Sequence, residues 1–357
     1  MLEWHVSLRV FDKIYAAERL DSDDALELFH SDDLFGIGRA ASSAAETRHD
    51  KKVYYTRNRH INPTNLCVNR CKFCAFSRSV GQDGAYAMTI DEILHTLAAS
   101  ASPFNELHIV GGLHPDWPFS YYLELISKIK LHHPHVQIKA FTAVEIDHFT
   151  KLSGLGLQGT LSKLKAHGLD MLPGGGAEIF NEGVRARLCP EKIHASRWLE
   201  IHEAAHNLGI KSNATMLYGH IETYEDRVEH LMALRQLQDS TGGFQAFIPL
   251  SYQPVDAVET TRYPSGIDDL KTIAISRLVL DNFPHIKAYW IMLGQKICQI
   301  ALFFGATDID GTVIEEKIAH SAGASSAPAL TTAEMIHLIT RAHKEAVQRN
   351  ATYEEVQ

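Results

Sequence analysis

Hydrophobic and polar positions alternate on two length scales from about residue 55 onward. Short apolar runs of strand length are separated by longer segments in which apolar residues recur every three or four positions, as in amphipathic helices. The runs predicted as strands are 57–63, 106–111, 136–142, 169–173, 210–217, 244–250, 285–292 and 300–305. Strands that alternate with helices predict a parallel α/β sheet, and eight such units close naturally into a (β/α)8 barrel of the TIM type. A doubly wound open sheet is the alternative.

The two ends of the chain lie outside this alternation. Residues 1–50 are predicted as an N-terminal helical extension, because apolar residues in "SDDALELFHSDDLFGIGRAAS" recur every three or four positions. The barrel is expected to occupy 51–320. Residues 321–357 are expected to form a flexible loop and a C-terminal helix packed on the barrel. The most apolar stretch, 288–306, includes Lys296, which favours a buried barrel element over a membrane span.

Composition narrows the class of protein further. The chain has 357 residues, 45% of them hydrophobic, so it can bury a large core. Its net charge of −9 argues against a nucleic-acid surface. Its first residues, "MLEWHVSLRVFDK", lack the basic and apolar regions of a signal peptide. The odd number of cysteines, five, then favours a reducing cytoplasm, with Cys189 and Cys298 as ordinary buried thiols.

Three of the cysteines, Cys67, Cys71 and Cys74, crowd into "NPTNLCVNRCKFCAFSR". This loop follows the first predicted strand, at the mouth where β/α barrels build their active sites. Clustered thiolates indicate zinc or an iron–sulfur cluster. Zinc would need a fourth ligand such as Cys189 or His60, and the protein could then be a zinc-stabilised binding barrel without catalysis. A [4Fe–4S] cluster tied to three cysteines instead leaves one iron open for a ligand.

The spacing Cys-x3-Cys-x2-Cys, with Phe73 before the last cysteine, resembles the signature of the radical S-adenosylmethionine (SAM) superfamily. The resemblance implies that the amino and carboxylate groups of SAM chelate the fourth iron. It implies that an electron from the cluster breaks the S–C5′ bond, giving methionine and a 5′-deoxyadenosyl radical. It also implies an external low-potential electron donor such as a flavodoxin or a ferredoxin.

Further segments, over about residues 50–320, resemble one family within that superfamily. "LHIVGGLHPD", "IKAFTAVEIDHF" and "SNATMLYGHIET" are similar to the aminofutalosine synthase family of the futalosine route to menaquinone. The cysteine loop and "GATDIDGTVIEEKI" are shared with its siblings, the cyclic dehypoxanthinyl futalosine synthase and the two halves of deazaflavin (F0) synthase. The final residues, "AVQRNATYEEVQ", match the family less clearly.

The resemblance implies residues that bind SAM at the mouth of the barrel. Gly111 and Gly112 follow the second predicted strand, where glycine lets a backbone approach a ligand closely. Leu113 replaces the acidic residue common after these glycines, and Glu178 is expected to take both ribose hydroxyls. A tight turn and structural or surface charges are the alternatives. The cofactor-binding candidates are Phe73, Gly111, Gly112, Glu145, Glu178, Arg185 and Lys192.

The implied substrate is 3-[(1-carboxyvinyl)oxy]benzoate, a dianion that needs donors for two carboxylates. Polar candidates along or just after the fifth, sixth and eighth predicted strands are Asn213, Thr215, His220, Gln245, Gly311, Thr312 and Glu315. His220 and Glu315, with Glu178, are expected to position the substrate or the radical, and satisfied structural residues are the alternative for each. No Ser-His-Asp arrangement or spaced carboxylate pair supports a hydrolase.

The implied reaction adds the adenosyl radical to carbon instead of abstracting hydrogen. C5′ would attack the methylene of the enolpyruvyl double bond, the aryl group would migrate, and the carboxylate would leave as CO2 or bicarbonate. The product would be 6-amino-6-deoxyfutalosine. The sibling cyclase, which abstracts a ribose hydrogen from dehypoxanthinyl futalosine and forms a spiro ring, is the alternative reaction. In both, the protein is expected to position the radical and exclude water.

Overall fold

Parallel strands form the centre of the molecule in the computed structural model, which describes residues 8–99, 103–253 and 263–356. Seven of them make one sheet in the order β2-β3-β4-β5-β6-β7-β8. They are β2 (Asn58–Ile61), β3 (Glu106–Ile109), β4 (Gln137–Ala140), β5 (Met171–Leu172), β6 (Lys211–Tyr218), β7 (Phe244–Ser251) and β8 (His285–Ile286). A doubly wound sheet reverses its strand order, and this sheet does not, so the open-sheet alternative is wrong.

An eighth strand, β9 (Asp308–Gly311), lies between the two edges of this sheet. Lys287, just after β8, forms a parallel bridge with Asp308. On the other side, Arg59 of β2 forms a parallel bridge with Ile314, just after β9. The strands therefore curl around a common interior with their carboxyl ends at one face, which confirms the predicted TIM-type barrel.

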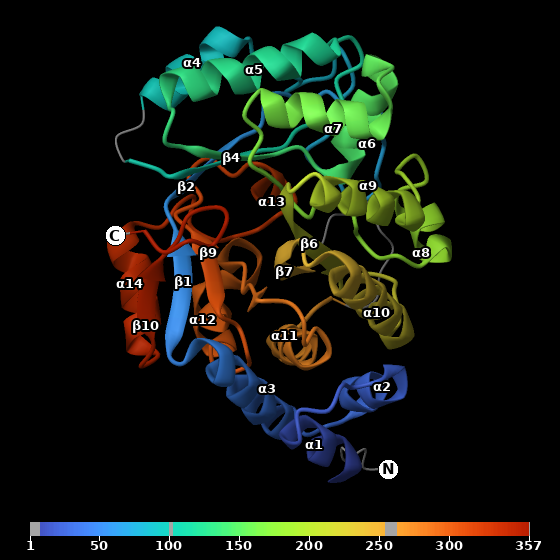
Figure 1. Ribbon diagram of the computed structural model, residues 1–357, viewed down its shortest axis with the longest axis vertical. Helices are drawn as coiled ribbons and strands as arrows, with labels where there is room; N and C mark the ends of the chain where they lie inside the picture. The colour runs from blue at the N-terminus through green and yellow to red at the C-terminus, as the bar shows by residue number, and fades with distance from the viewer. Residues whose placement is uncertain (1–7, 100–102, 254–262, 357) are drawn as a thin grey trace.

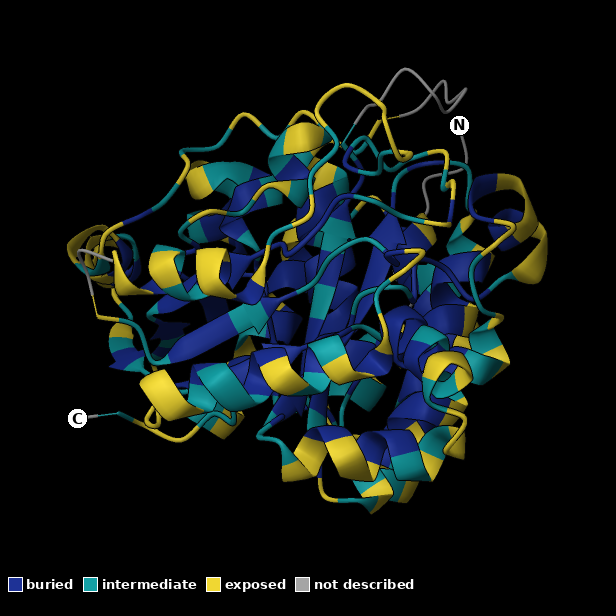
Figure 2. Cartoon of the chain, turned by 90° about the horizontal axis from the view of Figure 1, so that it is seen from above, coloured by how far each residue is buried: buried dark blue, intermediate teal, exposed yellow. Residues whose placement is uncertain are grey.

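Amphipathic helices surround the strands in Figure 1, and Figure 2 shows buried strands at the centre with exposed helix faces outside. Between the barrel strands and after β9 lie α4 (Ile90–Ala98), α5 (Phe119–His132), α6 (Ala143–Ser153), α7 (Gly156–Ala166), α8 (Glu182–Leu188), α9 (Ala195–Asn207), α10 (Tyr224–Thr241), α11 (Gly266–Val279), α12 (Trp290–Ala301) and α13 (Ile318–Ser321). Thr89, Thr142 and Thr223 each start a helix with a capping box. Within the described ranges, no helix is long and apolar enough to cross a membrane.

The predicted strand 300–305 is wrong. That segment contains the end of α12 and the turn after it, and the strand that closes the barrel is β9. The predicted strand 285–292 is also too long, because β8 ends at Ile286 and α12 begins at Trp290. An uninterrupted apolar run has no period that separates a strand from a buried helix, so the pattern could not decide between them.

Both ends of the chain join this barrel. The helical pattern of the first fifty residues corresponds to α1 (Leu8–Tyr15), α2 (Ser22–His30) and α3 (Leu34–His49), and residues 1–7 lie outside the described residues. Helix α3 packs against α11 on the outside of the barrel. A short strand, β1 (Lys52–Thr56), then pairs in parallel with β9 and leads into β2.

The sequence pattern predicts a C-terminal helix, but in the structure this helix ends early and a strand follows it. Helix α14 (Thr332–Arg341) is followed by a strand, β10 (Glu345–Gln348), which pairs in parallel with β1. The break between them is at His343, whose φ of 57° is left-handed and ends a helix. Beyond β10, the N–H of Arg349 donates to the Tyr55 carbonyl (2.8 Å) and keeps the tail on the barrel.

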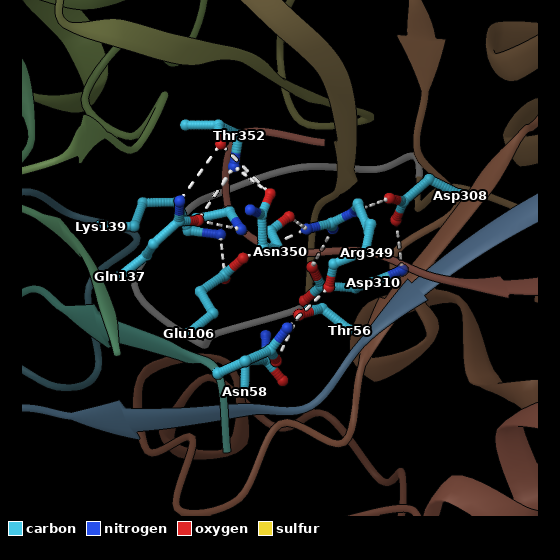
Figure 3. A network of polar contacts seen from close by, with 12 residues as sticks. Thr56, Asn58, Glu106, Gln137, Lys139, Asp308, Asp310, Arg349, Asn350 and Thr352 are labelled. Carbon is cyan, nitrogen blue, oxygen red and sulfur yellow. Dashed lines mark hydrogen bonds and ion pairs between the residues drawn. The ribbon is translucent and has the colours of Figure 1, made fainter. Parts of the chain in front are cut away.

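Charged side chains fill part of the barrel interior, and Figure 3 shows them as one network. Glu106 of β3 accepts hydrogen bonds from Lys139 of β4 and from Arg349 of the tail (3.1 Å). Arg349 also donates to Asp308 of β9 (2.6 Å). We call this group the floor network; its members, all buried, are Lys139, Lys287, Arg349, Glu106, Asp308 and Asp310. Within it cations and carboxylates pair, as buried charges must.

Candidate active site

One cavity opens at the carboxyl ends of the barrel strands and runs into the interior. Its volume is about 330 Å³. Its lining includes all three clustered cysteines and, at the other end, three members of the floor network, Lys139, Lys287 and Asp310. The cysteine loop and the buried charges of the barrel therefore face one shared space.

Backbone hydrogen bonds hold the cysteine loop in place after β2. The Cys67 N–H donates to the Arg78 carbonyl (3.2 Å), and the Cys74 N–H donates to the Cys71 carbonyl (3.0 Å). All three thiols are free and partly exposed, and all three line the cavity. Burial raises the pKa of the Cys71 thiol to about 12, while the nearby Lys192 ammonium acts in the opposite direction.

This loop fits an iron–sulfur cluster better than a zinc ion. A structural zinc needs four ligands that converge at about 2.0–2.3 Å from one point. In the part of the chain that the structure describes, no group of three or more His, Cys, Asp or Glu side chains is arranged to hold a single metal ion. In a [4Fe–4S] cluster each cysteine binds a different iron, so three thiols spaced around one loop suffice and one iron stays open.

Gly111 and Gly112 pack against the start of the cysteine loop. The Gly112 N–H donates to the Thr64 carbonyl (2.9 Å), and a Cβ added to Gly112 would lie 2.1 Å from the carbonyl oxygen of Leu66. Both glycines line the cavity. Only glycine permits so close an approach between the two backbones, so this pair sets the position of the loop.

Glu145 lies at the start of α6 and lines the same cavity. One carboxylate oxygen accepts the Gly111 N–H (3.2 Å), and the other accepts the N–H (2.7 Å) and hydroxyl (2.9 Å) of Thr142. Burial raises its pKa to about 7, although these hydrogen bonds oppose the rise. This carboxyl group therefore links the helix start to the glycine pair and changes charge near neutral pH.

Glu178, Lys192 and Phe73, three of the residues predicted to bind SAM, come together on the cavity wall. Lys192 donates to the Glu178 carboxylate, and its ammonium lies 5.1 Å from the centroid of the Phe73 ring. Burial acts to lower the pKa of Lys192, but Cys71 and Glu178 raise it above its ordinary value. Glu178 has a left-handed φ of 49°, a strained conformation that concentrates at functional sites.

The remaining predicted site residues divide into two that line the cavity and six that do not. Asn213 and Thr215 line the cavity, but six candidates are not among the described residues that do so: Arg185, His220, Gln245, Gly311, Thr312 and Glu315. Arg185 is buried and donates to surrounding backbone carbonyls, His220 contacts a backbone carbonyl (3.0 Å), and Glu315 pairs with Arg59 (3.0 Å). All three polar groups have protein partners, and their expected roles stay predictions.

Sequence reasoning missed the polar floor of the cavity. His60, His108 and Lys139 all line it, and each is the third residue of its strand. His60 faces His108 and His108 faces Lys139 in the parallel register. A polar residue at the same inward position of three consecutive barrel strands was the available signal.

Comparisons with known proteins identify the family of the chain. Residues 61–234 match the family described as the radical SAM superfamily, and residues 241–357 match the CofH/MqnC C-terminal region. The second match includes the final residues that by eye resemble the family less clearly. Among solved structures, methylornithine synthase has a TM-score of 0.75 at 18% identity, over 94% of this chain and 97% of that one, a likeness of fold.

Three curated relatives span most of the chain. An aminodeoxyfutalosine synthase of Thermus thermophilus is 45% identical over 97% of this chain and 95% of its own length. A 5-amino-6-(D-ribitylamino)uracil–L-tyrosine 4-hydroxyphenyl transferase of Methanococcoides burtonii is 40% identical over 85% and 87%. A cyclic dehypoxanthine futalosine synthase of Streptomyces coelicolor is 36% identical over 97% and 88%. The chain therefore belongs to the radical SAM superfamily, in the family that contains the aminodeoxyfutalosine synthases.

Proposed function

We propose that this radical SAM enzyme is an aminodeoxyfutalosine synthase, which joins the adenosyl group of SAM to 3-[(1-carboxyvinyl)oxy]benzoate. The observation that carries the proposal is one cavity with three thiols at its mouth and buried lysines at its floor. Such a cavity has room for a cofactor near the thiols and for a substrate that meets polar groups at the floor. The 45% identity to the Thermus synthase, against 36% to the cyclase, favours the same activity.

The proposed cofactor residues surround the mouth. Cys67, Cys71 and Cys74 would hold a [4Fe–4S] cluster, which when bound supplies one low-potential electron to SAM. A flavodoxin or a ferredoxin is the proposed source of that electron. The residues proposed to contact SAM are Phe73, Gly111, Gly112, Glu145, Glu178 and Lys192, all of which line the cavity.

The proposed reaction balances in atoms and electrons. The S–C5′ bond of SAM breaks, methionine leaves, and a bond forms between C5′ and the enolpyruvyl methylene. The aryl group moves from the ether oxygen to the adjacent carbon, the bond from that carbon to its carboxylate breaks, and the oxygen becomes a ketone. The electron used to cleave SAM is recovered when the carboxylate leaves as CO2, so no net oxidant or reductant is consumed.

The chain's own contribution to this reaction is positioning and exclusion. Apolar side chains form much of the cavity wall, among them Val110, Val144, Leu217, Ile248, Leu250 and Met292. They carry no thiol S–H group, the hydrogen-atom donor that most readily quenches a carbon radical, and they restrict access of solvent to the space around it. A radical held at the wrong place would be quenched as 5′-deoxyadenosine, so the substrate must be fixed firmly at the other end of the cavity.

Anaerobic incubation of the reduced, cluster-reconstituted enzyme with SAM tests the proposal. The substrates to compare are the enolpyruvyl benzoate, dehypoxanthinyl futalosine, and L-tyrosine with 5-amino-6-(D-ribitylamino)uracil. We expect mass analysis to find the adenosyl group inside a product only with the enolpyruvyl benzoate. Stoichiometric free 5′-deoxyadenosine with a cyclised futalosine, or with a coupled tyrosine fragment, would instead assign one of the related activities.

A further inference from the structure

A row of three polar side chains crosses the floor of the cavity. His60 of β2, His108 of β3 and Lys139 of β4 lie side by side in the parallel register and all line the cavity. The two imidazole rings stack with centroids 4.5 Å apart and planes 10° apart. We call these three residues the floor row. They lie on rigid barrel strands, so their positions are fixed before any ligand binds.

The imidazoles of the floor row lack protein partners. His60 Nε2 is buried and has no hydrogen bond among the described residues. Within the same ranges, no hydrogen bond to a ring nitrogen of His108 is found either. Buried polar groups are almost always hydrogen-bonded in native proteins. Two adjacent imidazoles that line the cavity and have no hydrogen-bond partner among the described residues therefore point to a ligand that accepts hydrogen bonds.

The charges around the floor row are already matched. Lys139 pairs with Glu106, and Lys287 pairs with Asp310. Burial lowers the pKa of both His60 and His108, so the stacked imidazoles are neutral at pH 7. The groups that face them are Lys139, Lys287, Glu106, Asp310 and Glu316. A bound anion would thus meet two neutral N–H donors and one lysine, and its charge would need compensation.

We propose that His60, His108 and Lys139 form the subsite that receives one carboxylate of the substrate, deep in the barrel and opposite the cysteine loop. The identity of the carboxylate rests on the proposed function. A carboxylate beside the imidazole pair favours its protonated form, so binding takes up a proton. The resulting charge-assisted hydrogen bonds fix the substrate at the end of the cavity far from the thiols.

Binding of 3-methoxybenzoate, an unreactive aryl carboxylate with a meta ether, tests this subsite without turnover. Calorimetric titration into the reconstituted enzyme with SAM should give an affinity that falls about tenfold or more in His108→Phe, which keeps a stacking ring but removes the donor. His60→Phe should behave in the same way. The matched control is His285→Phe, a buried histidine of β8 that stacks on His49 outside the cavity and should leave affinity unchanged.

Titration in two buffers with different ionisation enthalpies provides a second measurement. The wild-type enzyme should take up as much as about one proton per bound 3-methoxybenzoate at pH 7, and His108→Phe clearly less. Iron content and thermal melting of each variant show that it is folded and loaded. Equal affinity and equal proton uptake in the wild type and both floor variants would overturn the subsite, as would no binding to the wild type.

The two proposals fail in distinguishable ways. If the enolpyruvyl benzoate is converted but the floor variants keep the wild-type KM and bind 3-methoxybenzoate normally, the subsite is refuted and the proposed function stands. If 3-methoxybenzoate binding depends on His60 and His108 but the enolpyruvyl benzoate gives no adenosylated product, the subsite stands and the proposed function is refuted.

Discussion

Replacing Gly112 with alanine tests how the glycine pair holds the cysteine loop. The added Cβ would lie 2.1 Å from the carbonyl oxygen of Leu66 and 2.7 Å from its carbonyl carbon. Ordinary carbon–oxygen contacts are about 3.3 Å or longer, so the two backbones must separate by roughly 1 Å. Backbone atoms cannot swing aside as a flexible side chain can, so the loop that carries Cys67 must move.

The expected cost of this separation is that of an overpacked core, about 1–3 kcal/mol. If this cost falls on the cysteine loop, SAM affinity should fall by about 5- to 140-fold, since each 1.4 kcal/mol is tenfold. The measurements are iron and sulfide per chain after anaerobic reconstitution and SAM affinity by equilibrium dialysis. We expect Gly112→Ala to lose SAM affinity strongly and to retain less than a full cluster.

Its neighbour provides a graded comparison. A Cβ on Gly111 would lie 3.1 Å from the Thr64 carbonyl oxygen, a contact that a shift of a few tenths of an ångström relieves. Gly111→Ala should therefore be much milder than Gly112→Ala. Gly183→Ala, in helix α8 with only the Asn181 side chain nearby (3.2 Å), is the control and should be near neutral. Normal cluster content and SAM affinity in Gly112→Ala would refute this account of the loop.

Three further predictions follow from the site and the floor network. Cys71→Ala should abolish the iron–sulfur chromophore and SAM cleavage, and a variant that still held four irons per chain would contradict the assignment of the ligand. Arg349→Met should cost about 3–5 kcal/mol of stability, because it leaves Glu106 and Asp308 with too little positive charge. Thermal melting should show this loss in comparison with Arg341→Met, a substitution at an exposed arginine. Equal melting temperatures of the two variants would argue against it. Burial raises the pKa of Glu145 from 4.5 in the unfolded chain to about 7, so the native state holds this proton more tightly and stability should fall as pH rises from about 4.5 to about 7. Urea midpoints between pH 5 and pH 8 should fall more steeply in the wild type than in Glu145→Gln, and parallel curves would exclude this titration.

Local pattern alone predicted most of the barrel. The strands from β2 to β7 all overlap segments predicted as strands, because short segments bounded by turns and separated by helical patterns are typical of a parallel α/β sheet. The cysteine loop was recognisable for a similar reason, since its three ligands lie within eight consecutive positions and one loop can present them together. Gly111, Gly112 and Glu178 all line the cavity, because residues just after parallel strands share one face of the sheet.

Features that depend on contacts between distant segments could not be predicted from the sequence. Strand β9 was not predicted, because Ile309 is its only large apolar residue, and it becomes a strand through closure of the barrel against β8 and β2. Arg185 was expected at the SAM carboxylate because of its charge. In the structure it is buried and donates hydrogen bonds to the backbone carbonyls of Ala177 and Ile193. Arg349 enters the barrel only because β10 pairs with β1.

The arrangement of the floor row also depends on the tertiary structure. From the sequence alone, His60, His108 and Lys139 each fall within a predicted strand. The sequence does not determine which face of the sheet each side chain takes or which residues of neighbouring strands lie opposite one another. The parallel register of β2, β3 and β4 puts the three side chains in one row on the inner face. A shift of one residue in any strand would turn its side chain to the opposite face, and register is set by the packing of the whole barrel, not by any one segment.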